Sequence, residues 1–329
     1  MFAKVKPALL RPLRRLRAFM FSDAWSIGTE ARDLAREARD VASEAASETR
    51  SRLDASTDWM SDEIRKARVY GGLGHLLDRY PGLREHIGMS ESRVLSQNGE
   101  DGILRFLLDR LGVAAGSFVE IGAERHEANC LLLALYQSWT GVFVDGDPDV
   151  AANLAELLRH TADVRVVNEM VDPATVDAAM DRWGVPAQID VLSIDVDGSD
   201  YYVWEALRSV RARIVVIEYN AALDPDRALV QPPGAPAWDG TVNFGCSVGA
   251  LRRLAEEKGY GLVYLESSGT NAFFVALEHL TELGPLPAAR NRSPNYHLRP
   301  NGRHPGTFDE TRFVDIGQAG PNGAHRRTT

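Results

Sequence analysis

Three acidic residues at the ends of two apolar segments are the residues of this chain best placed for chemistry. Asp195 and Asp197 follow the mainly apolar segment 189–194, and Glu218 follows the segment 214–217. Short β-branched segments separated by a helix-length interval are typical of neighbouring buried parallel strands. Parallel strands end at the same edge of a sheet, where open α/β sheets bind their ligands. We therefore expect the three carboxylates to lie side by side in an active site.

Charge repulsion makes this acidic group a candidate cation site. Two carboxylates about 5 Å apart repel by roughly 3 kcal/mol at an effective dielectric constant of about 20. A fold offsets such a cost with a proton, a cation or a cationic ligand, so a sulfonium cofactor and a divalent metal ion both satisfy the requirement. Oxygen ligands from Asp195, Asp197 and Glu218 suit Mg2+. The alternative is that the acids cap the following turns and face water.

A second group of residues predicts an adenosine ligand. Glu120 and Gly122 follow one predicted strand, and Asp145 ends the next. A carboxylate at the position of Asp145 accepts hydrogen bonds from both ribose hydroxyls. The chain lacks the G-x-G-x-x-G spacing that cradles a pyrophosphate, and acids occupy that region in the segment 124–127. These features favour an adenosine ligand without a pyrophosphate, and S-adenosylmethionine fits.

The elements that must position these residues alternate between strand and helix, which predicts a doubly wound, mostly parallel α/β sheet of the Rossmann-like type. Helices are expected over 100–111, from 172–173 to 183, and over 247–258, each ended by a glycine. Seven strands are expected, over 117–121, 141–144, 164–167, 191–194, 214–217, 261–265 and 272–275.

One connection between these elements, residues 219–246, is too long to serve only as a link. Loops of this length in compact domains are usually lids or binding loops. Tyr219 and Asn220 are candidates for orienting an acceptor, and Trp238 is a candidate for stacking on a sugar ring. The alternative is that these side chains pack the loop against the core.

We divide the chain into four parts. Residues 1–20 form a basic amphipathic leader, which predicts either peripheral contact with a membrane surface or a solvated segment. Residues 21–92 form a helical arm and linker, whose apolar stripe is suited to packing on the main domain or to a homo-oligomer contact. Residues 93–285 form the Rossmann-like domain. Residues 286–329 are expected to be a disordered tail, since they lack apolar periodicity.

Composition narrows the functional class further. The 329 residues, 44% of them hydrophobic and 25% charged, are typical of a globular protein. A net charge of -9 argues against nonspecific nucleic-acid binding. The two cysteines, Cys130 and Cys246, favour a reduced cytoplasmic location, at the inner face of the membrane if the leader binds lipid.

Six motifs together resemble the FkbM-like class I S-adenosylmethionine-dependent methyltransferases. They lie at 96–102, 119–123, 144–147, 193–201, 216–220 and 269–275. The resemblance implies a seven-stranded methyltransferase sheet and O-methylation of a sugar, glycan or natural product. It also implies that Glu120 and Gly122 flank the methionine part of the cofactor, that Asp145 holds the ribose, and that Asp195 lies near the transferred methyl group. The usual second glycine of the first motif is missing.

Several roles stay open at this stage. Methyl transfer to a hydroxyl needs an aligned acceptor and a group that removes its proton. Asp195 or Asp197 is a candidate base, and His126 is a second candidate whose alternative is a surface salt bridge. The three acids are instead metal ligands if Mg2+ activates the acceptor. A catalytically inactive scaffold, a membrane-docked interaction protein and a nicotinamide oxidoreductase are the competing functions.

Overall fold

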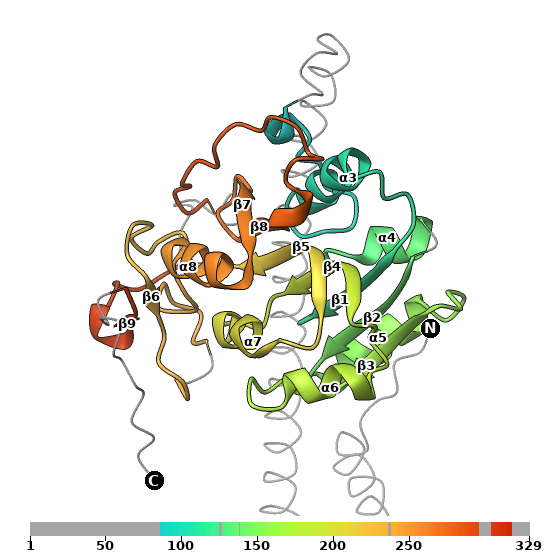
Figure 1. Ribbon diagram of the computed structural model, residues 1–329. Helices are drawn as coiled ribbons and strands as arrows, with labels where there is room; N and C mark the ends of the chain where they lie inside the picture. Colours follow the sequence, from blue (N-terminus) through green and yellow to red (C-terminus); the bar gives the residue numbers. More distant parts are fainter. Residues whose placement is uncertain (1–85, 125–126, 138, 236–237, 296–303, 318–329) are drawn as a thin grey trace, which may run out of the picture. The chain divides into compact units, whose positions relative to one another are not determined.

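The computed structural model describes residues 86–124, 127–137, 139–235, 238–295 and 304–317 (Figure 1). The predicted leader 1–20, most of the predicted arm 21–92 and the candidate base His126 lie outside these residues. Within the described ranges, no helix has the length and hydropathy needed to cross a membrane. Both cysteines are buried free thiols.

A seven-stranded sheet with the order β3-β2-β1-β4-β5-β8-β7 forms the centre of the fold. Strands β1 to β5 are parallel, while β8 is antiparallel to both of its neighbours. All seven predicted strands are confirmed. Their bounds are β1 Ser117–Ile121, β2 Thr140–Asp145, β3 Val164–Asn168, β4 Gln188–Ile194, β5 Arg211–Glu218, β7 Tyr260–Leu265 and β8 Asn271–Ala276.

Helices cover both faces of the sheet, so each face has its own apolar core (Figure 1). One core packs the sheet against α3 (Glu100–Arg110), α4 (Leu131–Tyr136) and α5 (Pro148–Leu157). The other packs it against α6 (Val176–Arg182), α7 (Asp200–Ala206) and α8 (Val248–Lys258). Because strands buried on both faces are apolar throughout, polar side chains within this sheet mark positions with a special role.

Helix ends follow the predicted capping chemistry at α8 and depart from it at α6. The Ser247 hydroxyl accepts a hydrogen bond from the Ala250 N–H at the start of α8, and Gly259 ends the helix with φ of 75°. Helix α6 was expected to begin at 172–173 but begins at Val176. The Asp172 carboxylate accepts from the Ala174 N–H, so a turn precedes the helix.

A small second sheet joins the long connection to the C-terminal region. Strand β6 (Leu229–Val230) pairs with β9 (Val314–Asp315), which follows the 3-10 turn Glu310–Arg312. Phe313 is buried on the β6 side, and Arg227 forms ion pairs with Glu310 and Asp315. The expectation of a disordered tail over 286–329 is therefore wrong for residues 304–317, whose order depends on contacts distant in the sequence. Two further 3-10 turns are Ile87–Met89 and Leu277–His279.

Gly122, immediately after β1, lets the ends of β1 and β4 approach each other. Its φ is 82°, and a Cβ atom at this position would fall inside the contact radius of the Asp195 carbonyl oxygen. The Gly122 N–H also donates to the carbonyl of Val144, at 2.8 Å. The glycine thus fixes the positions of three strand ends.

Gly122→Ala is expected to lower the free energy of unfolding by far more than the cost of placing an alanine in a left-handed conformation. Gly112 is the matched control, since its φ is 67° and a Cβ atom there would meet nothing within 4 Å. Gly112→Ala should cost roughly 1–2 kcal/mol, and Gly122→Ala at least about 2 kcal/mol more because of the overlap with Asp195. Urea unfolding measures both, and equal losses in the two variants would contradict the proposed contact.

Candidate active site

Strand alternation places a row of polar side chains on one face of the sheet, at the edge where the parallel strands end. The face is the one covered by α3, α4 and α5, because the apolar strand residues that point to the same side belong to that core. They are Phe118, Phe143, Val191, Val216 and Phe273. Glu120 pairs in register with Ser193, and Glu218 pairs with Asn271. The complete row, from β2 across to β8, is Asp145, Glu120, Ser193, Asp195, Glu218 and Asn271.

Asp195, Asp197 and Glu218 form a compact group within this region, which we call the acid triad. One carboxylate oxygen from each lies within 4.8 Å of the other two. Asp195 and Glu218 are half-buried, whereas Asp197 is exposed. The juxtaposition follows from strand order, since β4 and β5 are parallel neighbours in the sheet.

The acid triad differs from the buried acids nearby, because no group of the described chain donates a hydrogen bond to its carboxylates. Glu120 accepts from the N–H groups of Asn129 and Cys130, each at 2.7 Å. Asp200 likewise accepts from Val196 and Gly198 N–H groups, at 2.8 and 3.0 Å. Among the described residues, no hydrogen bond or ion pair reaches the three triad carboxylates, and the buried Glu218 Oε2 atom has no partner. The triad oxygens are therefore available to a ligand.

Burial and mutual repulsion favour protonation across this edge. Burial raises the pKa of Asp195 well above its usual value, and the charges of Asp200 and Asp197 raise it further. Burial and the charge of Asp195 do the same to the pKa of Glu218. Desolvation by burial raises the pKa of Glu120 to about 7. A bound cation would relieve this cost by favouring the charged carboxylates.

Asp145 has the position and the free oxygen that ribose binding requires. Its Oδ1 accepts from the Asp147 N–H at 2.7 Å, and no hydrogen bond in the described part of the chain reaches its Oδ2. Asp147 caps α5 by accepting from the Asp149 N–H at 2.7 Å. Asp145 is therefore the acid of this pair that is free to bind a ligand.

Glu120 and Gly122, predicted to flank the cofactor, make close contacts within the protein. Glu120 is only 2% exposed, and both of its carboxylate oxygens accept backbone N–H groups. Gly122 packs on the backbone of Asp195. Both residues fix the turn after β1, and their contact with a cofactor stays a prediction.

The predicted acceptor residues of the long connection hold the loop together. Asn220 is fully buried, and its amide donates to the carbonyls of Val242 and Phe244 at 2.8 and 3.0 Å. Tyr219 belongs to the core on the α7 side. Trp238 packs against Phe244, with ring centroids 5.3 Å apart, and also against the ring of His304. For these three residues the structure favours the packing interpretation.

The same loop nevertheless lies beside the acid triad. Gly198, one residue after Asp197, faces Gln231, since a Cβ atom there would be 3.3 Å from the Gln231 Oε1 atom. Gln231 in turn accepts from the Gly245 N–H at 2.9 Å and donates to the Asn243 carbonyl at 3.1 Å. Gln231 was missed because no local sequence pattern distinguishes a buried glutamine from an exposed one.

Two further residues of the polar edge also escaped sequence analysis. The Asn271 amide donates to the Glu100 carboxylate at 2.9 Å, which joins the start of α3 to the strand beside Glu218. Both residues lie within the quoted motifs 96–102 and 269–275. The motifs drew attention to the segments, but they gave no indication that these two side chains meet.

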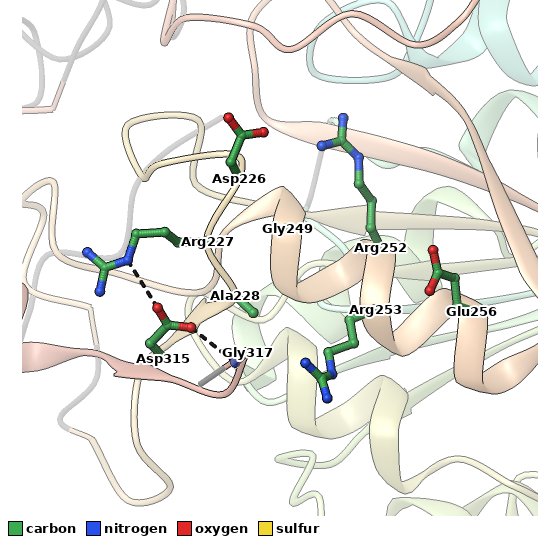
Figure 2. Close-up of a pocket in the computed structure, with 9 residues that line it drawn as sticks. All are labelled: Asp226, Arg227, Ala228, Gly249, Arg252, Arg253, Glu256, Asp315 and Gly317. Carbon is green, nitrogen blue, oxygen red and sulfur yellow. Dashed lines mark hydrogen bonds and ion pairs between the residues drawn. The ribbon is translucent and has the colours of Figure 1, made fainter. Parts of the chain in front are cut away.

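A surface cavity of about 500 Å3 lies between the start of α8 and the β6–β9 sheet (Figure 2). It is lined by three arginines, Arg227, Arg252 and Arg253, and three acids, Asp226, Glu256 and Asp315. Figure 2 shows Arg227 paired with Asp315 across one side. Its lining charges balance, and it contains none of the predicted site residues, so we do not assign it to the active site.

Comparisons with known proteins give low similarity. No family model and no curated protein matches the chain. The N-terminal domain of EvdMO1 with SAH bound is 15% identical, covers 55% of this chain and 80% of its own, and has a TM-score of 0.36. A TehB-like SAM-dependent methyltransferase from Corynebacterium glutamicum is 13% identical, with coverages of 63% and 98% and a TM-score of 0.32. These values assign neither family nor activity.

The class of fold follows from the topology of this chain itself. The sheet is doubly wound, with parallel β1 to β5 and an antiparallel β8 inserted between β5 and β7. This is the Rossmann-like methyltransferase fold. The acid triad and Asp145 lie at the carboxyl edge of this sheet, where such open α/β sheets bind ligands.

Stability of the unliganded protein should fall as pH rises from 5.5 to 7.5. Burial raises the pKa values of Glu120, Asp200 and Glu266 to about 7, 6 and 7. The folded state therefore binds more protons than the unfolded state between about pH 4 and 7, and each extra proton lowers the unfolding free energy by about 1.4 kcal/mol per pH unit. Urea unfolding in buffers containing a chelator measures this slope.

Asp195→Asn provides a specific check of that slope, because it removes a charge and no hydrogen bond. The variant should be more stable than wild type at pH 7.5 and should show a shallower pH dependence. Asp181→Asn, at an exposed position of α6, is the control and should change neither quantity. Wild-type stability that increases from pH 5.5 to 7.5 would contradict the proposed cost of the buried acids.

Proposed function

We propose that this protein is an S-adenosylmethionine-dependent methyltransferase that acts on a hydroxyl group of a sugar, glycan or natural product. The observation that carries the proposal concerns the carboxyl edge of the sheet, where the parallel strands end. This edge holds two separate groups of carboxylates. Asp145 offers a free carboxylate oxygen at the end of β2, and the acid triad offers unpartnered negative charge at the ends of β4 and β5. A ligand with a ribose and a positive centre satisfies both parts.

The cofactor assignment is supported by charge as well as by position. Asp145 suits the two ribose hydroxyls because a carboxylate accepts strong hydrogen bonds. The triad carboxylates attract a sulfonium, and Asp195 directly follows β4, which β1 separates from β2, the strand that ends at Asp145. Met170, 78% exposed, lies beside Gly146 and supplies an apolar surface next to Asp145. An adenine ring placed there would cover this exposed side chain.

Methyl transfer requires an acceptor oxygen in line with the methyl carbon and a group that takes the acceptor proton. The cofactor supplies an electrophilic methyl group, and the C–S bond breaks as the C–O bond forms. Asp195, which has no competing hydrogen bonds among the described residues, is the carboxylate best placed to accept the proton. A bound positive charge beside it would keep it ionised until the transfer.

Two competing functions have weaker support. A nicotinamide dinucleotide carries a pyrophosphate, but the turn after β1 contains acidic Glu124 and Glu127 and lacks the glycine spacing for phosphate binding. An inactive scaffold has no need of a cluster of carboxylates without donors, which destabilises the fold at neutral pH. The O-methyl specificity and the acceptor class rest on the sequence resemblance stated above.

Asp145→Ala should weaken binding of S-adenosylmethionine and S-adenosylhomocysteine at least about a hundredfold. The two lost hydrogen bonds involve a charged group, and each contributes about 1.5–3 kcal/mol. Asp147→Ser is the matched control, because serine retains the cap of α5 and should leave the affinity within about threefold. Isothermal titration calorimetry measures both cofactors, with NAD as a third ligand.

The outcomes separate the three functions. Binding of S-adenosylmethionine with loss in Asp145→Ala supports the proposal, and transfer of a radiolabelled methyl group to a panel of monosaccharides distinguishes an enzyme from an inactive binding protein. Tight NAD binding would support an oxidoreductase. Failure of the folded wild-type chain to bind any of the three ligands would overturn the proposal in favour of a scaffold.

A further inference from the structure

We propose that Asp195, Asp197 and Glu218 together bind one divalent metal ion, Mg2+ or Mn2+, and that the acceptor binds to this ion through two neighbouring oxygen atoms. The inference rests on the proposed methyl transfer and adds a metal site and a substrate class to it. The acceptor class that fits is a vicinal diol or a hydroxy acid, whose paired oxygens chelate a hard cation.

The arrangement of donor atoms is the first support. Three carboxylate oxygens from two adjacent strands lie within 4.8 Å of one another, close enough to share one ion. Within the described residues this is the single group of three acidic, histidine or cysteine side chains with such spacing. Many other acids lie on the surface without forming such a group. The proximity of these three is therefore not explained by the net charge of the chain.

The lack of internal partners is the second, independent support. A buried carboxylate normally accepts hydrogen bonds, as Glu120 and Asp200 do from backbone N–H groups in the same region. The buried Glu218 Oε2 atom has no partner among the described residues. Asn271, its register neighbour on β8, is 1% exposed, and its Oδ1 atom also has no partner there. A cation bound by the triad would supply the partner that the Glu218 oxygen lacks.

The chemistry of the ligands selects the kind of ion. All three are carboxylates, which favour hard cations such as Mg2+ and Mn2+ over the softer metals that prefer cysteine or histidine. No lysine or arginine of the described chain forms an ion pair with them, so a side chain does not already fill this role. Asp197 is exposed, which leaves the ion open on the solvent side.

The open side of the ion defines the acceptor. Mg2+ prefers six ligands in an octahedral arrangement, and three monodentate carboxylates leave about three positions for water or substrate. Two neighbouring substrate oxygens fill adjacent positions, and the ion lowers the pKa of the hydroxyl that attacks the methyl group. Asp195, if it binds the ion, then acts by holding it. The metal activates the acceptor hydroxyl, whose proton would pass to a water molecule on the open side of the ion as the C–O bond forms and the C–S bond breaks.

The test uses Mn2+ as the probe and follows its binding to the full-length protein by electron paramagnetic resonance. Wild type, freed of metal by a chelator and dialysed, should bind one Mn2+ per chain, and Mg2+ should compete. Asp197→Asn and Glu218→Gln should each weaken binding at least tenfold. Both substitutions remove a charge without removing a hydrogen bond, and asparagine tolerates the φ of 52° at position 197.

Glu256→Gln, in the surface cavity of Figure 2, is the matched control and should leave Mn2+ affinity unchanged. The absence of saturable binding to wild type, unchanged binding in both triad variants, or an equal loss in the control would each overturn the metal site. Titration of S-adenosylhomocysteine into the same samples distinguishes the two proposals. Cofactor binding without Mn2+ binding refutes only the metal site, and Mn2+ binding without cofactor binding refutes only the methyltransferase.

Discussion

Convergence of the strand ends at one edge of a parallel sheet is the constraint on which the rest of this structure depends. The close contact of Gly122 with the backbone of Asp195 sets how near the ends of β1 and β4 approach. Each of β1, β2, β4 and β5 carries an acid at or near its carboxyl end, so the contact concentrates negative charge. Repulsion between such groups at an effective dielectric constant of about 20 amounts to a few kcal/mol per close pair.

The fold distributes these acids between two tasks. Glu120 and Asp200 accept backbone N–H groups and so determine the turns that follow β1 and β4. The acid triad accepts none within the described chain and keeps its oxygens for a ligand. The first task stabilises the backbone around the site, and the second leaves a local cost that a positive ligand relieves. Stability and ligand binding are therefore linked through the same edge of the sheet.

Sequence patterns predicted the parts of this structure that depend on local chemistry. Apolar β-branched segments located all seven strands, and a glycine marked the end of α8. The triad followed from the one general rule that adjacent parallel strands end together. The strand and helix inferences use only residues within one element or a single turn, whereas the triad also required that rule about neighbouring strands.

The features that sequence patterns did not predict depend on contacts between segments far apart in the chain. The pairing of β6 with β9 involves two residues on each strand, which is too short for a periodic signal. Asn220 was a candidate either for orienting an acceptor or for packing the loop, and its amide donates to loop carbonyls more than 20 positions later. A polar residue after a strand has the same sequence signature whether it faces a ligand or supports a loop. The membrane and oligomer roles expected for residues 1–92 stay predictions.

A crystal structure of the protein with S-adenosylhomocysteine tests the division of the carboxyl edge most directly. The ribose hydroxyls should lie within hydrogen-bonding distance of the Asp145 carboxylate, and the sulfur atom should lie on the side of the acid triad, next to Asp195. A nucleoside bound away from Asp145, or with its sulfur directed away from the triad, would contradict the central claim that this edge positions the cofactor for methyl transfer.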